Sequence, residues 1–407
     1  MIDYLYDWAN LLGRWLHLIT GIAWIGASFY FVWLDNSLLP PKRKELIDAG
    51  VGGEVWAVHG GGFYNAQKYK TAPAELPEPL HWFYWEAYTT WLSGFFLLCL
   101  LYFGQAEIYL IDSSVMALSK PIAIGIALAF LVAGWLIYDV LCRFFFQRNE
   151  RALGLLVALM LGIAAWALCQ LYSGRGAYIL YGAMIGTIMV ANVFFVIIPG
   201  QREMVRAKAE GRALDAVYGL RGKQRSVHNT YFTLPVLFVM ISNHYALTYG
   251  AKWNWLVLIA MSVAGAAIRT WFVMRHKAHE RGGKTSPWPL VIGLVVLVAT
   301  IAALAPRTVA HTQGVVADPA AAAQRFADVQ SIVNQRCVPC HAAKPSFAGF
   351  PAAPKGVLLD TPEHIFAHTV AMQTQLATRT MPVGNITQMT DAEREAVLAW
   401  LRDGAPK

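Results

Sequence analysis

Residues 121–142 read PIAIGIALAFLVAGWLIYDVLC, and Asp139 is their one charged side chain. A run of about 20 apolar residues can cross the hydrocarbon core of a membrane as one α-helix. Similar runs recur at residues 11–34, 82–103, 152–172, 177–198, 231–249, 253–274 and 288–305. We therefore predict an all-α fold whose main part is a polytopic bundle of about eight transmembrane helices. The run at 231–249 is the least regular, because Pro235, Asn243 and His244 interrupt it.

The composition of the whole chain supports a membrane protein. Of its 407 residues 57% are hydrophobic and only 14% are charged, whereas soluble domains carry about 25% charged residues. The 15 Trp and 17 Tyr suit a protein with aromatic anchors at the membrane interfaces. We expect the lipid bilayer to be the main environment of residues 1–305.

Lysine and arginine predict the orientation of this bundle. The loops at 35–80, 143–151, 199–228 and 275–286 hold 19 of them, and the alternate loops at the other side hold three. Basic residues favour the cytoplasmic side, so the N-terminus and everything after residue 305 should lie outside, in the periplasm of a bacterial inner membrane. The formal net charge of +8 is then an orientation signal, and we expect no nucleic-acid partner.

A redox motif follows the last apolar run. Residues 336–341 read RCVPCH, which is the C-x-x-C-H attachment motif of c-type haem. Cys337 and Cys340 can each form a thioether to the porphyrin, and His341 can ligate the iron. A zinc site would need further ligands, and no cysteine follows Cys340. A thioredoxin-like pair would need a βαβ frame, which the sequence lacks.

The C-terminal part reads as a small class I-like cytochrome c domain at residues 321–407, joined by a linker at 306–320. Helices are expected from Ala323, from Thr361 with its following proline, and from a capping box at Thr390. Met381 is the expected second axial ligand, because it lies 40 residues after His341 in a loop-like context. Met372 and Met389 are the alternatives.

Polar groups inside apolar helices are candidates for function, because charge is costly in hydrocarbon. One group is expected at the cytoplasmic face. Its aromatic neighbours and the three glycines at 60–62 suit a planar ligand with exchangeable protons. The alternative is an aromatic belt beside a flexible loop. The members of this group are His59, His81, Glu86, His228, Asn229 and Thr230.

A second pair, His17 and His244, is expected nearer the outer face. Two histidines could hold a b-type haem in the membrane, although a lone membrane histidine is more often a structural hydrogen-bonding group. A b haem would supply a second one-electron centre.

Four long segments now identify a family. They read RWLHLITGIAWIGASFY from residue 14, EVWAVHGGGFYNAQKY from 54, HWFYWEAYTTWLSG from 81 and SVHNTYFTLPVLFVMISNHY from 226. Together with the fused RCVPCH motif, they resemble the PuuD family of membrane-bound urate oxidases, also called urate hydroxylases. The resemblance implies purine catabolism: urate is oxidised to 5-hydroxyisourate, and electrons pass through the c haem to the respiratory chain.

The resemblance implies urate as the substrate, and a soluble cytochrome c or a terminal oxidase as the electron acceptor. We expect Glu86 or His228 to accept a proton from urate, with the other four members of the cytoplasmic group nearby. Arg14 and Arg269 suit haem propionates or structural roles better than substrate binding. Two other functions stay open: a respiratory quinol or cytochrome electron-transfer protein without urate chemistry, and a transporter or sensor with a fused cytochrome.

Overall fold

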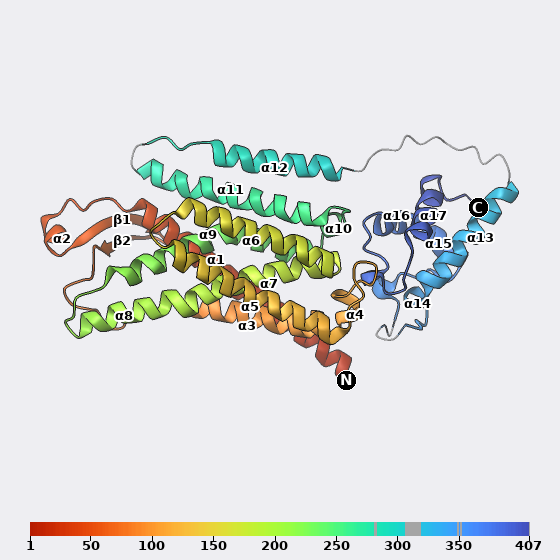
Figure 1. Cartoon of the computed structure of the whole chain (residues 1–407), viewed down its shortest axis with the longest axis horizontal. Helices are drawn as coiled ribbons and strands as arrows, with labels where there is room; N and C mark the ends of the chain where they lie inside the picture. Colours follow the sequence, from red (N-terminus) through yellow and green to blue (C-terminus); the bar gives the residue numbers. More distant parts are fainter. Residues whose placement is uncertain (281–282, 306–318, 348–349, 351, 407) are drawn as a thin grey trace.

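The computed structural model describes residues 1–280, 283–305, 319–347, 350 and 352–406. Long helices lie side by side as a bundle, and a smaller helical module is placed at one end of it (Figure 1). The helices of the bundle are α1 (Ile2–Ser37), α3 (Trp85–Leu97), α5 (Lys120–Phe145), α6 (Glu150–Leu171), α7 (Gly174–Asn192), α8 (Ile198–Ala209), α9 (Ala216–Ser242), α11 (Asn254–Glu280) and α12 (Trp288–Leu304).

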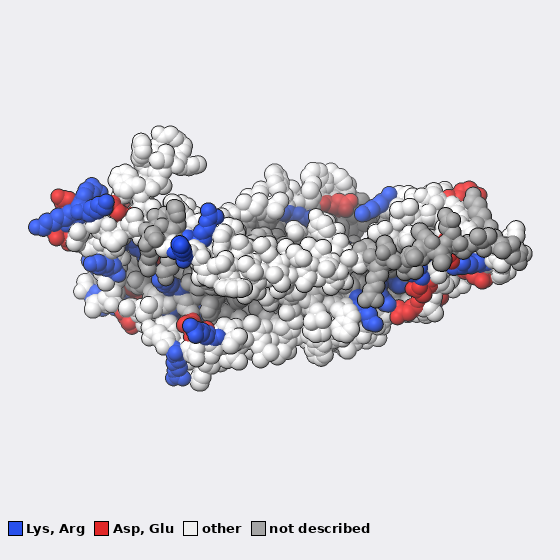
Figure 2. Space-filling model, turned by 90° about the horizontal axis from the view of Figure 1, so that it is seen from above, with Lys and Arg blue, Asp and Glu red and all other residues white. Residues whose placement is uncertain are grey.

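Two ends of the bundle can be told apart. The hairpin end carries α2 (Lys44–Asp48) and the strands β1 (Val51–His59) and β2 (Gly62–Tyr69). The module end carries the N-terminus, α4 (Ala106–Tyr109), α10 (Ala246–Tyr249) and the residues from 319 onward (Figure 1). Figure 2 shows Lys and Arg gathered at the hairpin end and few charges over the middle of the bundle on the visible face.

Six helices in the described part are long and apolar enough to cross a membrane. They include α7, which runs through the π-helical segment η2 (Val193–Ile197) into α8, and α3, which continues into η1 (Leu98–Phe103). Helix α12 is apolar but shorter. Helix α9 is not among the helices that are long and apolar enough to cross a membrane. The chain is thus a mostly helical protein with several helices that could span a membrane.

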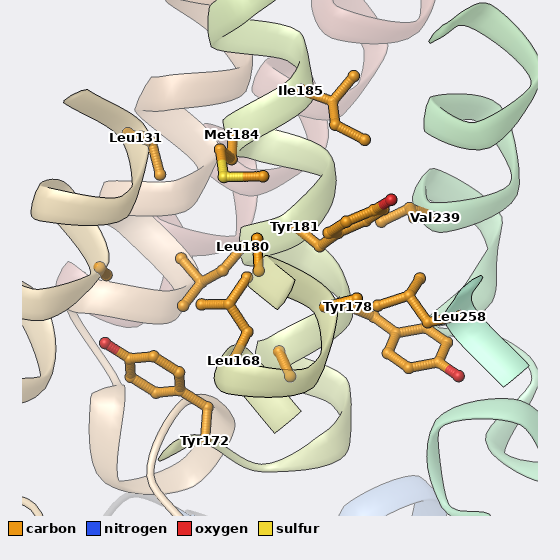
Figure 3. Close-up of a cluster of buried hydrophobic side chains, with 14 of the residues drawn as sticks. Leu131, Leu168, Tyr172, Tyr178, Leu180, Tyr181, Met184, Ile185, Val239 and Leu258 are labelled. Carbon is orange, nitrogen blue, oxygen red and sulfur yellow. The ribbon is translucent and has the colours of Figure 1, made fainter. Parts of the chain in front are cut away.

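The central helix of the bundle is α7. Its side chains Leu180, Tyr181, Met184 and Ile185 are almost completely buried, and they meet residues from several other helices (Figure 3). Small residues allow this close packing. A Cβ built on Gly182 would lie 2.6 Å from Cγ1 of Val239, so α7 and α9 touch at this point without room for a side chain.

Helix α9 differs from its expected bounds. The expected run began at residue 231, but the helix begins at Ala216 and ends at Ser242. Asp215 caps its first turn by accepting a hydrogen bond from the backbone N–H of Val217, 2.9 Å away. The first half of α9 is polar and mostly exposed, and its buried polar side chains, Arg225, Asn229 and Thr230, lie toward the middle of the helix. His244 therefore lies beyond the helix.

The β1–β2 hairpin was not expected in an all-α protein. Its strands pair antiparallel, with His59 opposite Gly62. Gly60 and Gly61 form the turn with φ of +58° and +81°, which glycine adopts without a Cβ penalty. The turn gives a structural reason for Gly60 and Gly61, and the interpretation of the three glycines as a ligand-approach site stays a prediction.

The C-terminal module is helical where it is described. Its elements are α13 (Pro319–Arg336), α14 (Val338–His341), η3 (Pro354–Gly356), α15 (Pro362–Ala367), α16 (Thr369–Ala377), η4 (Val383–Asn385) and α17 (Asp391–Arg402). Two of the three expected helix starts are confirmed: Thr361 caps α15, and Thr390 forms a capping box with Glu393 on α17. The helix expected from Ala323 begins earlier, at Pro319. Most of the expected linker, residues 306–318, lies outside the described residues.

The module contacts the bundle through the loop around η4. A Cβ on Gly384 would lie 2.9 Å from the carbonyl oxygens of both Ile108 and Ile111, beside α4. A Cβ on Gly250, which follows α10, would lie 1.7 Å from the carbonyl oxygen of Thr378. Both contacts are backbone-to-backbone, and neither position has space for a larger residue.

The Gly182 contact gives a prediction about the bundle. Gly182→Ala should destabilise the protein by about 1–3 kcal/mol, because the new methyl group overlaps Val239. Gly186→Ala, one turn further along α7, meets no atom within 4 Å and should be neutral or stabilise by up to about 1 kcal/mol. Thermal unfolding in detergent compares the two. Equal midpoints would contradict the packing described for α7 and α9.

The module gives a prediction about pH. Arg336 donates two hydrogen bonds to Oε1 of Glu393, at 3.1 and 2.8 Å, and holds the pKa of this carboxyl below its usual range. The pair therefore stabilises the module above the ordinary glutamate pKa of about 4.3, and the stabilisation is lost as the pH falls through the lower folded-state value.

Glu393→Gln should weaken the module at neutral pH and flatten this acid dependence. Glu395→Gln is the control, because that carboxylate is on the same helix and its side chain is 64% exposed. Hydrogen-exchange protection factors of α13 and α17 at several pH values measure both effects. An unchanged acid dependence in Glu393→Gln would rule the pair out as its source.

Candidate functional site

Buried polar side chains form a network between α5, α7 and α9, toward the hairpin end. Its centre is an ion pair: Nη2 of Arg225 lies 2.7 Å from Oδ1 of Asp139. The side chain of Arg225 is 4% exposed and that of Asp139 is 12% exposed. The other carboxylate oxygen of Asp139 accepts a hydrogen bond of 2.6 Å from Nε of Arg143. Both carboxylate oxygens are therefore compensated.

The network continues from Arg225 to α7. Nη1 of Arg225 donates to Oδ1 of Asn192 at 3.3 Å, and Nδ2 of Asn192 donates to Oδ1 of Asn229 at 2.8 Å. Asn229 in turn donates to the backbone oxygen of Met189 at 3.0 Å. A chain of satisfied buried polar groups fixes the register of the three helices, because each unmade hydrogen bond there would cost about 1–3 kcal/mol.

The far end of the network is a histidine. Nδ1 of His228 lies 2.8 Å from the hydroxyl of Tyr138, and this hydroxyl accepts a hydrogen bond of 3.2 Å from Asn192. Arg225, His228 and Asn229 are three and four residues apart, so they lie on one face of α9. That face meets α5 and α7. The ring of His228 is thus held on its Nδ1 side.

A cavity of about 240 Å³ begins at His228. Its walls come mostly from α6, α9 and α11 and are apolar, with Phe232 and Pro235 among them. Three other polar residues line it: Tyr231, Tyr181 and Ser262, of which the last two share a hydrogen bond of 3.4 Å. An apolar cavity with a few convergent polar groups is the usual form of a small-molecule site.

The cytoplasmic group expected from the sequence is only partly brought together. His228 and Asn229 belong to the network just described. Thr230 is buried beside them, but its hydroxyl donates back to the carbonyl oxygen of Ser226 at 3.0 Å. These three residues remain site candidates.

The other three expected members lie elsewhere. His59 is exposed at the end of β1, and His81 is exposed with its ring against Phe83. Glu86 is half-buried in the first turn of α3, among the aromatic residues Tyr84 and Tyr88. No hydrogen bond or ion pair in the described part links any of the three to His228. The single six-residue site expected from the sequence is therefore not formed.

His17 is held between α1 and α3. Its Nδ1 lies 3.0 Å from the carbonyl oxygen of Thr90 and 3.1 Å from the hydroxyl of Ser93. Gly94 makes room for the ring, because a Cβ there would lie 2.8 Å from Cε1 of the imidazole. These contacts orient the ring through Nδ1 and do not involve Nε2.

His17 and His244 do not form a pair. His17 contacts Thr90 of α3, and the next residue, Trp91, donates a hydrogen bond of 3.0 Å to Thr187 of α7. His17 is therefore near the level of Thr187. Val239 of α9 meets α7 more than one turn nearer the module end, at Gly182, and His244 lies beyond Val239 in an exposed turn. The two histidines are thus at different depths, and a b haem bridging them does not fit.

Comparison with known proteins identifies the larger part of the chain. The family described as "Urate oxidase N-terminal" matches residues 3–305. The chain belongs to this family. The match covers the whole helical bundle, with the network and the cavity, and supports the resemblance to PuuD-type urate oxidases. No curated protein and no solved structure gives a match to the chain.

The residues of this urate oxidase family member that lie beyond the match include the RCVPCH motif. His341 is on α14, and its Nδ1 lies 2.9 Å from the carbonyl oxygen of Val357. Such a bond orients the ring and leaves Nε2 for a metal. Among the described residues, no three His, Cys, Asp or Glu side chains gather as a metal site would require. The arrangement fits a haem ligand better than a zinc site.

The methionines of the module differ in their surroundings. Met372 and Met389 are 7% and 3% exposed and belong to the hydrophobic core. Met381 is half-buried in the loop before η4, and its carbonyl oxygen accepts a hydrogen bond of 2.6 Å from Arg394. Met381 thus differs from the two alternatives in lying on a loop and outside the buried core.

Tyr138, Asn192 and Arg225 are site residues that the sequence reasoning did not name, and it noted Asp139 only as a polar group in an apolar helix. One signal was available. Asp139 is an acid inside an apolar helix, so it needs a basic partner. The basic segment before residue 231 offers Arg225, which precedes His228 by three residues and Asn229 by four.

The ion pair gives a prediction. Asp139→Asn should destabilise the protein by about 3–5 kcal/mol, because Arg225 is left buried without its counter-charge. Arg143→Gln should cost less than about 1 kcal/mol, since that side chain is 74% exposed. Thermal unfolding of both variants measures the difference. A stable Asp139→Asn protein would refute the role of the pair.

Proposed function

We propose that the chain is a membrane-bound urate oxidase that converts urate to 5-hydroxyisourate and passes the electrons to a c-type haem on its C-terminal module. The family match over residues 3–305 carries this proposal. The substrate site is the cavity at His228, because it joins apolar walls for a planar purine to a polar network.

His228 is the proposed proton acceptor. Oxidation of urate to 5-hydroxyisourate adds one water and releases two electrons and two protons. A base is needed at the substrate, and among the described residues His228 is the one that both lines the cavity and belongs to the hydrogen-bonded chain through Tyr138. The sequence left Glu86 and His228 as alternatives, and the position of the cavity favours His228.

The proposed c haem would supply a one-electron acceptor. Cys337 and Cys340 would hold it covalently, and His341 and Met381 would be its axial ligands. The contact of the Met381 loop with the module end of the bundle supports transfer from the membrane part to the module. The second electron of each turnover has no assigned centre, since His17 and His244 do not fit a b haem.

The proposed location is a bacterial inner membrane, with the N-terminus and the module in the periplasm. The gathering of Lys and Arg at the opposite, hairpin end supports this orientation (Figure 2). Urate would then enter from the cytoplasmic side, and a soluble cytochrome or a terminal oxidase would take the electrons outside.

One observation favours a second candidate function. Val263 lines the cavity and is 46% exposed on the bundle surface, so the cavity reaches the lipid-facing side. An apolar cavity with a histidine at its end also suits a quinol. The chain would then be a respiratory quinol–cytochrome electron-transfer protein without urate chemistry.

The deciding experiment uses the full chain, purified with its haem in the ferric state and kept without oxygen. Urate should reduce the haem and convert to 5-hydroxyisourate, and a quinol should not be required. A haem that stays ferric with urate would overturn the proposal. Reduction by a quinol alone would establish the second function.

A variant pair tests the role of His228. His228→Gln should slow haem reduction by urate by roughly a hundredfold or more, as expected when a general base is lost. Glu86→Gln is the comparison, because Glu86 is in the first turn of α3 and does not line the cavity, and its rate should stay within roughly a factor of three. The reverse result would move the proton acceptor to Glu86.

A further inference from the structure

Arg269 is a buried cation in α11, within the segment apolar enough to cross a membrane. The residue is 6% exposed. Phe29 of α1 covers one face of its guanidinium, with the charged carbon 3.7 Å from the ring centroid. Arg269 thus lies at the contact between α1 and α11, where water does not reach it.

This cation has no counter-charge in the part of the chain that the structure describes. Its Nε and Nη2 atoms are buried and have no hydrogen-bond partner, and none of the ion pairs includes it. Arg225 is the opposite case, because Asp139 compensates it at 2.7 Å. An uncompensated buried charge is strongly unfavourable, so a binding partner for Arg269 would relieve a large penalty.

The two unpartnered atoms define the shape of that partner. In a guanidinium, the N–H bond of Nε and one N–H bond of Nη2 point in the same direction along one edge. This edge donates two parallel hydrogen bonds to a pair of adjacent acceptor atoms. The free edge of Arg269 therefore suits a flat anion with two neighbouring acceptors.

Arg269 is also next to the cavity described above. Ala266, three residues earlier on the same face of α11, lines the cavity. Tyr231 of α9 lines it too and interacts electrostatically with Arg269. Arg269 thus lies next to two residues that line the cavity, although it does not line the cavity itself, and His228 lies one turn before Tyr231 on α9.

We propose that Arg269 binds the negative charge of the substrate, through a bidentate contact to a planar anion that carries a carbonyl oxygen beside a deprotonated ring nitrogen. Urate as its monoanion has this pattern. The inference rests on the proposed function for its ligand and adds the residue that selects the anionic form. It replaces the structural or haem-propionate role that the sequence suggested for Arg269.

The test measures equilibrium binding of radiolabelled urate to the full chain in detergent. Arg269→Gln should weaken binding by roughly tenfold to a hundredfold, the range for a lost charged hydrogen-bonding group. Arg269→Lys keeps the charge without the fork, and it should bind with an intermediate affinity. Arg275→Gln is the matched control, because Arg275 is on the same helix, is exposed and stacks on Trp271.

A second measurement needs no variant, so it tests the inference even if the Arg269 variants do not fold. The unmodified protein should lose affinity for urate as the pH falls below the first ionisation of urate itself, because the neutral purine cannot offset the charge of Arg269. Equal affinity for neutral and anionic urate, or wild-type affinity in a folded Arg269→Gln protein, would overturn the inference and leave the proposed function intact. A parent protein that neither binds nor oxidises urate would instead overturn the proposed function.

Discussion

Asp139 and Arg225 meet 2.7 Å apart in a bundle whose other walls are almost entirely apolar. Removing either charge would leave the other buried without its partner, at a cost of several kcal/mol. Their pairing holds α5 against α9, and Asn192 of α7 completes the contact. The pair thus anchors α9 at Arg225, although most of the first half of this helix is exposed. His228 is carried on that half, so the position of the candidate site follows from the same ion pair.

Local chemistry predicted the elements that depend on neighbouring residues. Apolar runs located the long helices, and Pro362 and the Thr390 capping box located two helix starts in the module. Two elements could not be found in this way. The first half of α9 looked like a basic loop because its buried partners are distant in sequence, and the glycines at 60–62 satisfied a ligand hypothesis as well as a hairpin turn.

The candidate site shows the same limit. His228 and Asn229 were expected, because polar residues beside an apolar run are unusual. Their contacts with Tyr138 and Asn192, however, join residues 90 and 37 positions apart, and one sequence contains no record of such pairs. His59, His81 and Glu86 were grouped with them because they share an expected side of the membrane. Sharing a side does not bring side chains together, and none of these three residues lines the cavity.

The contact between module and bundle has a consequence for the transfer of electrons under the proposed function. Tunnelling rates fall steeply with each added ångström, and here the spacing is set where Gly250 and Gly384 bring backbone against backbone. A larger residue at either position would push the module away from the bundle. Under the proposed function, such a change would lengthen the electron path between the two parts without altering the substrate cavity.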